Sequence, residues 1–208
     1  MGVAADERRE LSALLDELGP DQPTLCEGWR TRDLAAHLVL REHRPDAAPG
    51  IAVPALASYT RKVQEGYSAQ PWHELVEQVR SGPAWYWPTK IGPVDELVNG
   101  AEFLVHHEDV RRGQPNWAPR QADAARDAAA WRTVKAMAKL SLRRSPVGVV
   151  LRTESGEELT AKAGNPTVAV VGSPVELLLF VFGRNAVQVE YQGDPDDVAR
   201  VTSMSRGI

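Results

Sequence analysis

The sequence predicts a mainly α-helical protein with a small α+β unit at its C-terminal end. Over roughly the first two-thirds of the 208 residues, apolar side chains recur at helical spacing, and proline or glycine separates the helical segments. After Pro146 the pattern changes to short β-rich runs with turn residues between them. We therefore expect a helical bundle over residues 1–145 and a small α+β domain over residues 146–208.

The predicted bundle consists of helices whose ends carry recognisable residues. Leucines at helical spacing predict the first helix, which stops at Gly19-Pro20. Thr31 is expected to cap the second helix, and the clearest helix is expected to begin at Pro93 and to have Gly113 as its C-terminal cap. The expected helices cover residues 4–18, 31–42, 53–66, 71–81, 93–112 and 120–142.

The C-terminal third is predicted to alternate short strands with short helices. Three β-rich runs come first, VGVVLRT, ELTAKAG and TVAVVG, and turn residues separate them. Ser173 and Pro174 then suit the cap and the first position of a short buried helix, SPVELLLFVFGR. AVQVEY returns to the alternation of a strand, and DPDDVARVTSM predicts a last helix.

Composition and charge exclude several kinds of protein. The chain is 43% hydrophobic and 25% charged, as in ordinary soluble globular proteins, and it is long enough to bury a core without disulfides. Because 24 basic residues stand against 28 acidic ones, a net charge of −4, a nucleic-acid partner is not expected. The longest apolar stretch, residues 175–182, contains Glu176 and is far too short to span a membrane.

These features together predict a cytoplasmic protein. The N-terminal segment is charged from Asp6 onward and lacks the apolar core of a signal peptide. The single cysteine, Cys26, permits no internal disulfide and fits a reducing compartment. The expected partner is a small-molecule substrate, with no nucleic acid and no membrane, and the assembly considered is a homodimer.

The strongest chemical pattern is a carboxylate and an imidazole four residues apart, Glu102 and His106. Four residues turn an α-helix by about 400°, so both side chains leave the same face, one turn apart. Their stripe also contains Val98 and Val105, so it borders the buried side, where a carboxylate needs a partner. A cation between the two side chains would be one such partner. The alternatives are a Glu–His hydrogen bond at the helix surface and a helix edge exposed to water.

A second polar residue, His37, lies within LAAHLVL, a helical stretch that is otherwise apolar. A lone histidine in such a place is often a satisfied core residue, but here two helices of one bundle each direct metal-binding side chains inward. Together His37, Glu102 and His106 would supply two nitrogens and one oxygen and leave coordination positions open, as in catalytic zinc sites. The same ligand types also suit non-haem iron.

The residues that follow in VHHEDVRR are expected to have other roles. His107 lies about 100° round the helix from His106, so the two do not easily address one centre. Asp109 lies nearer the stripe and is a candidate to orient a ligand histidine from outside the ligand set. Glu108 is expected on a solvated face, paired with one of the two following arginines.

Two further features have both a structural and a chemical interpretation. Cys26 is either a small buried side chain or a reactive thiol, and the first is favoured because its loop offers no evident base. The aromatic residues Trp85, Tyr86 and Trp87 either close one end of the core or wall a substrate pocket.

Three segments resemble a known family. TLCEGWRTRDLAAHLVLRE, followed by RPDAAPG, resembles the N-terminal signature of actinobacterial proteins related to mycothiol-dependent maleylpyruvate isomerase, within the DinB-like superfamily of metal-binding four-helix bundles. NGAEFLVHHEDVRRGQPNW resembles the second metal motif of that bundle, Glu-x-x-x-His. SPVELLLFVFGR and its flanking strands are similar to the small C-terminal domain of this group, which is related to sterol-carrier-like folds.

The resemblance implies a fold, a ligand set and a type of reaction. The fold would be a DinB-like four-helix bundle with a sterol-carrier-like α+β unit, and His37, Glu102 and His106 would hold a divalent metal, with zinc favoured. The resemblance also implies mycothiol as a thiol cosubstrate. The chemistry agrees with this, because a divalent ion with one carboxylate ligand keeps a net positive charge and favours a bound thiolate over a thiol. Arg184, in the FGR segment, is a candidate to bind an anionic substrate.

Three functions from different classes remain as predictions. The first is a zinc-dependent transferase or isomerase that uses a thiol, mycothiol, to attack a small electrophilic substrate. The second is a non-enzymatic metal- or ligand-binding protein whose centre is saturated or closed to solvent. The third is an iron-dependent oxygenase with the same ligands. An open coordination position at the bottom of a pocket would favour an enzyme over the binding protein.

Overall fold

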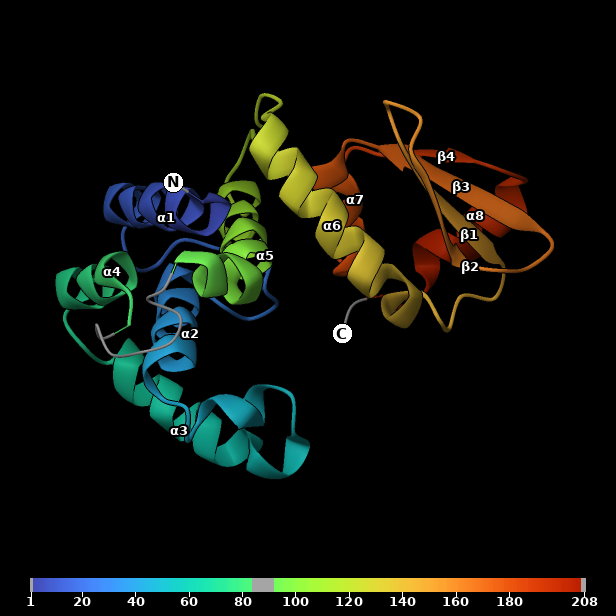
Figure 1. The fold of residues 1–208 in the computed structure, drawn as a ribbon. Helices are drawn as coiled ribbons and strands as arrows, with labels where there is room; N and C mark the ends of the chain where they lie inside the picture. The colour runs from blue at the N-terminus through green and yellow to red at the C-terminus, as the bar shows by residue number, and fades with distance from the viewer. Residues whose placement is uncertain (1, 84–91, 207–208) are drawn as a thin grey trace. The chain divides into compact units, whose positions relative to one another are not determined.

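The computed structural model describes residues 2–83 and 92–206, and within them the chain is mostly helical with a four-stranded sheet (Figure 1). The chain divides into two compact units, Met1–Ala118 and Pro119–Ile208. In the described part of the first unit all the regular elements are helices, and the sheet lies in the second unit. The predicted mainly α-helical fold with a small C-terminal α+β part is therefore confirmed.

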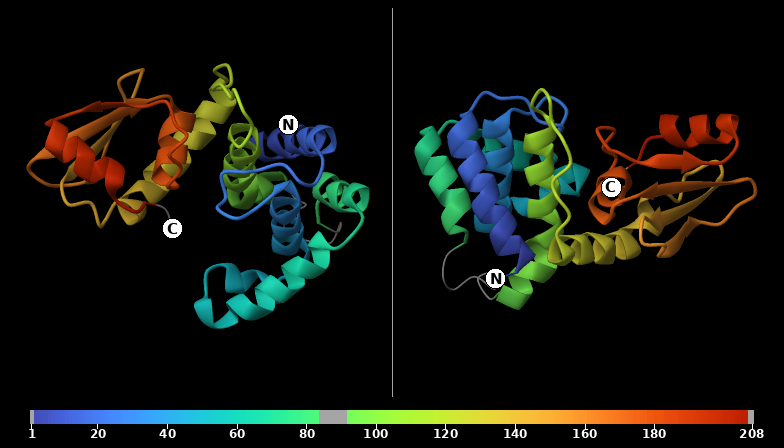
Figure 2. Two further views of the ribbon diagram at one scale, coloured as in Figure 1. Left: turned by 180° about the vertical axis from the view of Figure 1, so that it is seen from behind. Right: turned by 90° about the horizontal axis from the view of Figure 1, so that it is seen from above.

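The first unit is a bundle in which four helices share one hydrophobic core. Figure 2 shows α1, α2, α4 and α5 side by side, and α3 packs on α2. The core takes its buried side chains from those four helices, with Leu11 and Leu15 on α1, Leu38 on α2, Val79 on α4 and Phe103 on α5 among them. The described helices of this unit are α1 (Val3–Leu18), α2 (Thr31–His43), η1 (Ala48–Ile51), η2 (Pro54–Leu56), α3 (Ala57–Ser68), α4 (Trp72–Ser81) and α5 (Gly92–Arg112).

The expected helices of this unit are found, with ends that differ by a few residues. The one over residues 53–66 forms as the short 3-10 helix η2 followed by α3, which extends to Ser68. None of the helices within the described ranges is both long and apolar enough to cross a membrane.

The start of α2 is capped differently from the prediction. Arg30, not Thr31, occupies the N-cap, and its backbone N–H donates to Oδ2 of Asp33 at 3.0 Å. Thr31 is the first helical residue, and its hydroxyl donates to the carbonyl of Gly19 at 2.6 Å. The hydroxyl therefore ties the beginning of α2 to the end of α1 instead of serving its own helix.

The second unit is a mixed sheet with the strand order β2-β1-β3-β4. Strand β1 pairs antiparallel with β2 and parallel with β3, and β4 runs antiparallel to β3. Helix α7 follows β3 and packs on β1 and β3, and every residue from Val175 to Val181 is buried, as expected for this apolar run. The elements are α6 (Ala124–Ser141), β1 (Gly148–Thr153), β2 (Glu158–Lys162), β3 (Thr167–Gly172), α7 (Pro174–Val181), β4 (Glu190–Gln192) and α8 (Pro195–Ser203).

The division between the units lies before α6, whereas the sequence pattern places it after residue 145. Helix α6 packs chiefly on α7, and the hydroxyl of Ser141 donates to the carbonyl of Val181. The buried side of α6, which includes Trp131 and Val134, is thus covered by elements that follow it in the chain. An apolar stripe predicts that a helix is covered but not by which neighbour, so the sequence alone groups α6 with the helices before it.

Candidate metal centre

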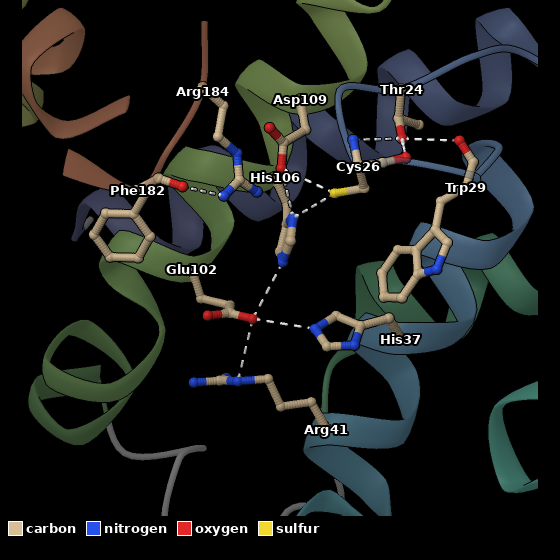
Figure 3. A network of polar contacts seen from close by, with 10 residues as sticks. All are labelled: Thr24, Cys26, Trp29, His37, Arg41, Glu102, His106, Asp109, Phe182 and Arg184. Carbon is tan, nitrogen blue, oxygen red and sulfur yellow. Dashed lines mark hydrogen bonds and ion pairs between the residues drawn. The ribbon is translucent and has the colours of Figure 1, made fainter. Parts of the chain in front are cut away.

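Helices α2 and α5 bring three side chains of the helical unit to one point (Figure 3). Oε1 of Glu102 lies 3.3 Å from Nε2 of His37 and 3.3 Å from Nε2 of His106. The two imidazole rings meet edge to face, with centroids 5.2 Å apart. All three candidate ligand atoms lie within 4.8 Å of one another. The structure therefore brings together the three residues that the sequence nominates as ligands.

The helices explain why these side chains converge. Glu102 and His106 are one turn apart on α5, so they project from the same face, as their spacing predicts. His37 lies on α2 among buried neighbours, and only 6% of it is exposed. His106 is 8% exposed, whereas the side chain of Glu102 is 24% exposed. The carboxylate thus marks the more open side of the cluster.

The distance from Oε1 of Glu102 to each of the two imidazole nitrogens, 3.3 Å, is long for a charge-assisted hydrogen bond and matches the separation of two ligand atoms on one metal ion. Two ligand atoms bound tetrahedrally to zinc at its usual bond lengths are about 3.3 Å apart. A charge-assisted hydrogen bond between an imidazole and a carboxylate is shorter, at about 2.7–2.9 Å. The neighbouring pair of His107 and Glu7, which is also buried, has this shorter distance, 2.7 Å.

Asp109 and Cys26 lie behind His106, on the side away from the other two ligands (Figure 3). Oδ2 of the fully buried Asp109 is 2.9 Å from Nδ1 of His106. In this arrangement Nδ1–H of His106 can donate to the carboxylate, which leaves the lone pair of Nε2 directed to the candidate metal position. The thiol of Cys26 donates to the same oxygen of Asp109 at 3.3 Å, and its sulfur is 3.9 Å from Nδ1 of His106.

The loop between α1 and α2 carries Cys26 to this position because it lies directly against the end of α5. The backbone N–H of Leu25 donates to the carbonyl of Asp109 at 3.0 Å. Gly113, just after α5, approaches the loop so closely that a Cβ there would be 2.4 Å from the carbonyl oxygen of Pro23. Glycine is therefore required at this position for a close approach, in addition to its predicted place just after the helix.

The ionisation of the metal-free site follows from burial and from these contacts. Burial lowers the pKa of His37, and the hydrogen bond to Glu102 only partly opposes this shift. Burial alone would raise the pKa of Glu102, but the contacts with His106 and His37 hold it well below its usual range. Burial also opposes the charged form of His106, but Asp109, Cys26 and Glu102 raise its pKa well above the ordinary value. In the metal-free site these shifts in pKa favour the ionised form of Glu102, the neutral form of His37 and the protonated form of His106.

Arg41, which the sequence analysis does not single out, also belongs to the site. It lies one turn after His37 on α2, and its Nε is 3.4 Å from Oε1 of Glu102. Its Nη1 donates to Oδ1 of Asn99, which is fully buried on α5. Its spacing of four residues from His37 places it on the same face of α2, but the local pattern does not indicate its contacts with Glu102 and Asn99 on α5.

A cavity of about 470 Å³ lies beside His37, between α2, α3 and the loop before α2. Trp29 forms part of its wall, and the indole ring packs on the imidazole of His37 with centroids 5.1 Å apart. The remaining lining is mixed, with the polar residues Asp33, Arg61 and Gln64 beside apolar ones such as Ile51. A small polar molecule could therefore approach the cluster from this side.

The other residues considered from the sequence lie elsewhere or differ from expectation. His107 faces Glu7 on α1 and does not join the cluster, as predicted. Glu108 does pair with Arg111 and Arg112, but the expectation of a solvated face is wrong, because Glu108 is completely buried. Burying this carboxylate is tolerable because two guanidinium groups neutralise it.

Cys26 differs from its expectation, and the expected roles of Arg184 and of the aromatic residues 85–87 stay predictions. Cys26 is neither fully buried nor without a base, since His106 and Asp109 approach it from α5. Arg184 follows α7 in the second unit, where its Nη1 donates to the carbonyl of Phe182, and its role toward a substrate stays a prediction. The predicted aromatic wall of residues 85–87 lies outside the described residues.

A helical bundle that directs two imidazoles and one carboxylate to a single point defines a class of protein, one with a candidate mononuclear metal centre. Within that class, the fold is similar to that of two crystal structures of the mycothiol-dependent maleylpyruvate isomerase. The first, of a mutant with one histidine replaced by alanine, matches with a TM-score of 0.59 and 16% identity over 92% of this chain and 90% of that one. The second matches with a TM-score of 0.52 and 14% identity over the same shares of both chains.

At such low sequence identity, the structural similarity shows a shared fold and nothing further. No family model matches the sequence, and no curated protein matches it. The roles of individual residues must therefore be argued from the site itself.

Proposed function

We propose that this chain is a divalent-metal-dependent enzyme, with zinc as its metal, that uses a small thiol to attack an electrophilic substrate in a transferase or isomerase reaction. The observation that carries the proposal is the 3.3 Å spacing from Oε1 of Glu102 to Nε2 of both His37 and His106. Mycothiol is the candidate thiol, because the solved structures with a similar fold are of an isomerase that depends on it.

The donor set suits a catalytic centre. His37, Glu102 and His106 would be the three protein ligands, and a tetrahedral ion would then keep one position for an exogenous ligand. A divalent ion there would bind the thiol as its thiolate, which is the nucleophilic form.

The residues around the ligands have separate roles in this proposal. Asp109 would fix the tautomer and orientation of His106 through Nδ1. Trp29 packs on His37 and would keep bulk water from one side of that ligand. The cavity beside His37 would hold the body of the thiol, so that its sulfur reaches the cluster.

The cavity also supports an enzyme over a protein that only stores metal. A storage centre would be expected to have a saturated or covered ligand set, whereas here a space of about 470 Å³ reaches one of the candidate ligands.

Elemental analysis of protein purified without an affinity tag tests the metal part of the proposal. We expect about one zinc per chain in the wild-type protein and almost none in His37→Ala or His106→Ala. His73→Ala is the matched control, because the side chain of His73 is 82% exposed on α4. Wild-type protein without metal, or His37→Ala with unchanged metal content, would contradict the proposal.

Titration of the cobalt-substituted protein with mycothiol tests the thiol part. A sulfur ligand should add a thiolate-to-cobalt charge-transfer band and change the visible ligand-field spectrum. The analogue in which a hydroxyl replaces the thiol is the control and should leave that charge-transfer region unchanged. If mycothiol also leaves the spectrum unchanged, the thiol part is wrong even though the metal site stands.

A further inference from the structure

We infer that an exposed apolar segment of the helical unit, residues 51–59, is the surface through which two copies of this chain associate. Its sequence, IAVPALASY, contains no charged side chain, and every residue in it is exposed except Ala57, which is half-buried. The described residues include five exposed large hydrophobic side chains, and four of them lie in this segment: Ile51, Val53, Leu56 and Tyr59. Single exposed apolar side chains are common on soluble proteins, whereas a contiguous group marks a surface that another molecule covers.

The apolar segment comprises the end of η1, the whole of η2 and the start of α3, and Figure 1 shows these elements at one end of the helical unit. The hydroxyl of Thr60 donates to the carbonyl of Ala47 at 2.5 Å. Gly50 packs so closely here that a Cβ would lie 2.0 Å from Oγ1 of Thr60 and 2.5 Å from the carbonyl oxygen of Leu56. The exposed side chains are therefore presented by a fixed backbone, and an ordered surface loses little conformational entropy when a partner binds.

The charges next to the apolar segment are already neutralised within one copy. Arg44 donates to both carboxylate oxygens of Asp46, at 2.8 and 2.6 Å, and the hydroxyl of Tyr59 donates to the same carboxylate at 2.5 Å. A partner that covers this edge would therefore leave no unpaired charge behind it, which is the costly case.

A second copy of the chain fits this surface better than an anionic membrane does. Membrane surfaces attract clusters of about four to eight basic side chains, whereas the apolar segment has none and Asp46 neutralises the neighbouring Arg44. A second copy brings an identical uncharged surface, and a two-fold axis pairs such a surface with itself, apolar side chain against apolar side chain. The adjacent pair of Arg44 and Asp46 carries both signs of charge, so it is compatible with its own copy across the axis.

The size of the segment indicates a reversible dimer. A standard interface takes about 20–30 residues from each partner, so these nine residues would form its apolar centre and the polar side chains around them its rim. We expect a dissociation constant on the order of micromolar for an interface with so small a centre.

The interface would also lie next to the cavity beside His37. Ile51 and Ala57 belong to the apolar segment and line that cavity as well. Because Ile51 is 47% exposed, a second copy packed on it would cover this part of the cavity wall. The inference stands on the surface alone and does not depend on a metal or on the proposed reaction.

Sedimentation velocity of the untagged full chain, from about 1 μM to about 200 μM, tests the inference. The wild-type protein should shift from the mass of one chain to that of two as its concentration rises. Val53→Glu and Leu56→Glu should each weaken association about 100-fold or more, because a two-fold axis brings both introduced carboxylates into one apolar interface. Leu140→Glu is the matched control, since Leu140 is equally exposed, at 44%, but lies on α6, and it should associate like the wild type.

Hydrogen exchange of the wild-type protein provides a second measurement that does not require a variant to fold. The backbone amides of residues 51–59 should exchange more slowly at the higher concentration than at the lower one. A wild-type protein that stays monomeric over the whole range, or slower exchange at another surface only, would overturn the inference. So would loss of association in Leu140→Glu together with normal association of Leu56→Glu. Binding of a monomeric wild-type protein to phosphatidylserine vesicles, abolished by Leu56→Glu, would assign the segment to a membrane instead.

Discussion

Nε2 of His37 and Oε1 of Glu102 lie 3.3 Å apart although 65 positions separate the two residues in the chain. One atom comes from α2 and the other from α5, so their distance depends on how the bundle packs. A metal ion bound to both atoms would link α2 and α5, which the chain connects through α3, α4 and the segments between them. Metal binding and the stability of the bundle should therefore be coupled.

Zinc should raise the free energy of unfolding of the wild-type protein. At a free zinc concentration of about 100 times the dissociation constant, the expected gain is about 2.7 kcal/mol. Urea denaturation with and without a chelator measures it. Glu102→Gln should lose the gain because a ligand is removed, whereas Glu74→Gln, on an exposed side chain of α4, should keep it. A chelator-independent midpoint in the wild-type protein would contradict the coupling.

Asp109→Asn should weaken zinc binding about 10- to 100-fold without removing a ligand. The carboxylate accepts from Nδ1 of His106 at 2.9 Å, and a neutral amide would hold the ring less firmly and make Nε2 a poorer donor. Competition with a chromophoric chelator measures the dissociation constant. Asp6→Asn, at an exposed position of α1, serves as the control. An unchanged dissociation constant in Asp109→Asn would show that Asp109 does not tune the ligand.

Metal uptake should release about one proton from His106 at neutral pH. The pKa of His106 is raised well above its ordinary value in the metal-free site, so the imidazole is protonated there, and metal binding requires the lone pair of Nε2. Glu102 is already ionised and His37 already neutral, since the pKa of each is lowered. The affinity should therefore rise with pH, about tenfold per unit, up to the pKa of His106 in the metal-free protein.

Calorimetric titration of zinc in buffers with different ionisation enthalpies counts the released protons. His107→Gln is a useful comparison, since His107 pairs with Glu7 away from the cluster and its loss should leave the count unchanged. A proton count near zero at pH 7 would contradict the charge state assigned to His106.

The sequence is sufficient for those features that depend on local periodicity. The same-face placement of Glu102 and His106 follows from the geometry of one helix, and so does the approach of Asp109 to His106 three residues earlier. The inward position of His37 follows from its apolar neighbours on α2. Each of these inferences needs only the pitch of a helix and the burial of one side.

Features that depend on contacts between distant segments cannot be predicted from the local sequence pattern. Cys26 meets Asp109 only because the loop before α2 lies on the end of α5, and nothing in the loop sequence indicates this partner. Arg41 looks like an ordinary helix-surface arginine until Asn99 and Glu102 are placed beside it. For the same reason, α6 carries a predictable buried stripe but no local sign of the neighbour that covers it.

Glu42→Gln should destabilise the protein by about 3 kcal/mol or more, because it leaves the buried guanidinium of Arg8 without its counter-charge. The side chains of the pair are 10% and 3% exposed, and Arg8 is held in place by the carbonyl of Val79 and by the ring of Phe103, 4.1 Å from its guanidinium carbon. Arg8 therefore has no easy route to water when Glu42 is neutral. Urea denaturation of the metal-free protein measures the loss.

The exposed pair of Arg44 and Asp46 provides the control for Glu42→Gln. Asp46→Asn should change the unfolding midpoint little, since water solvates both partners. Added salt separates the two cases further. The loss in free energy of unfolding caused by Glu42→Gln should stay almost unchanged in salt, because mobile ions do not reach a buried pair. If this loss disappears in molar salt, or is no larger than the loss caused by Asp46→Asn, then Arg8 reaches solvent in the variant.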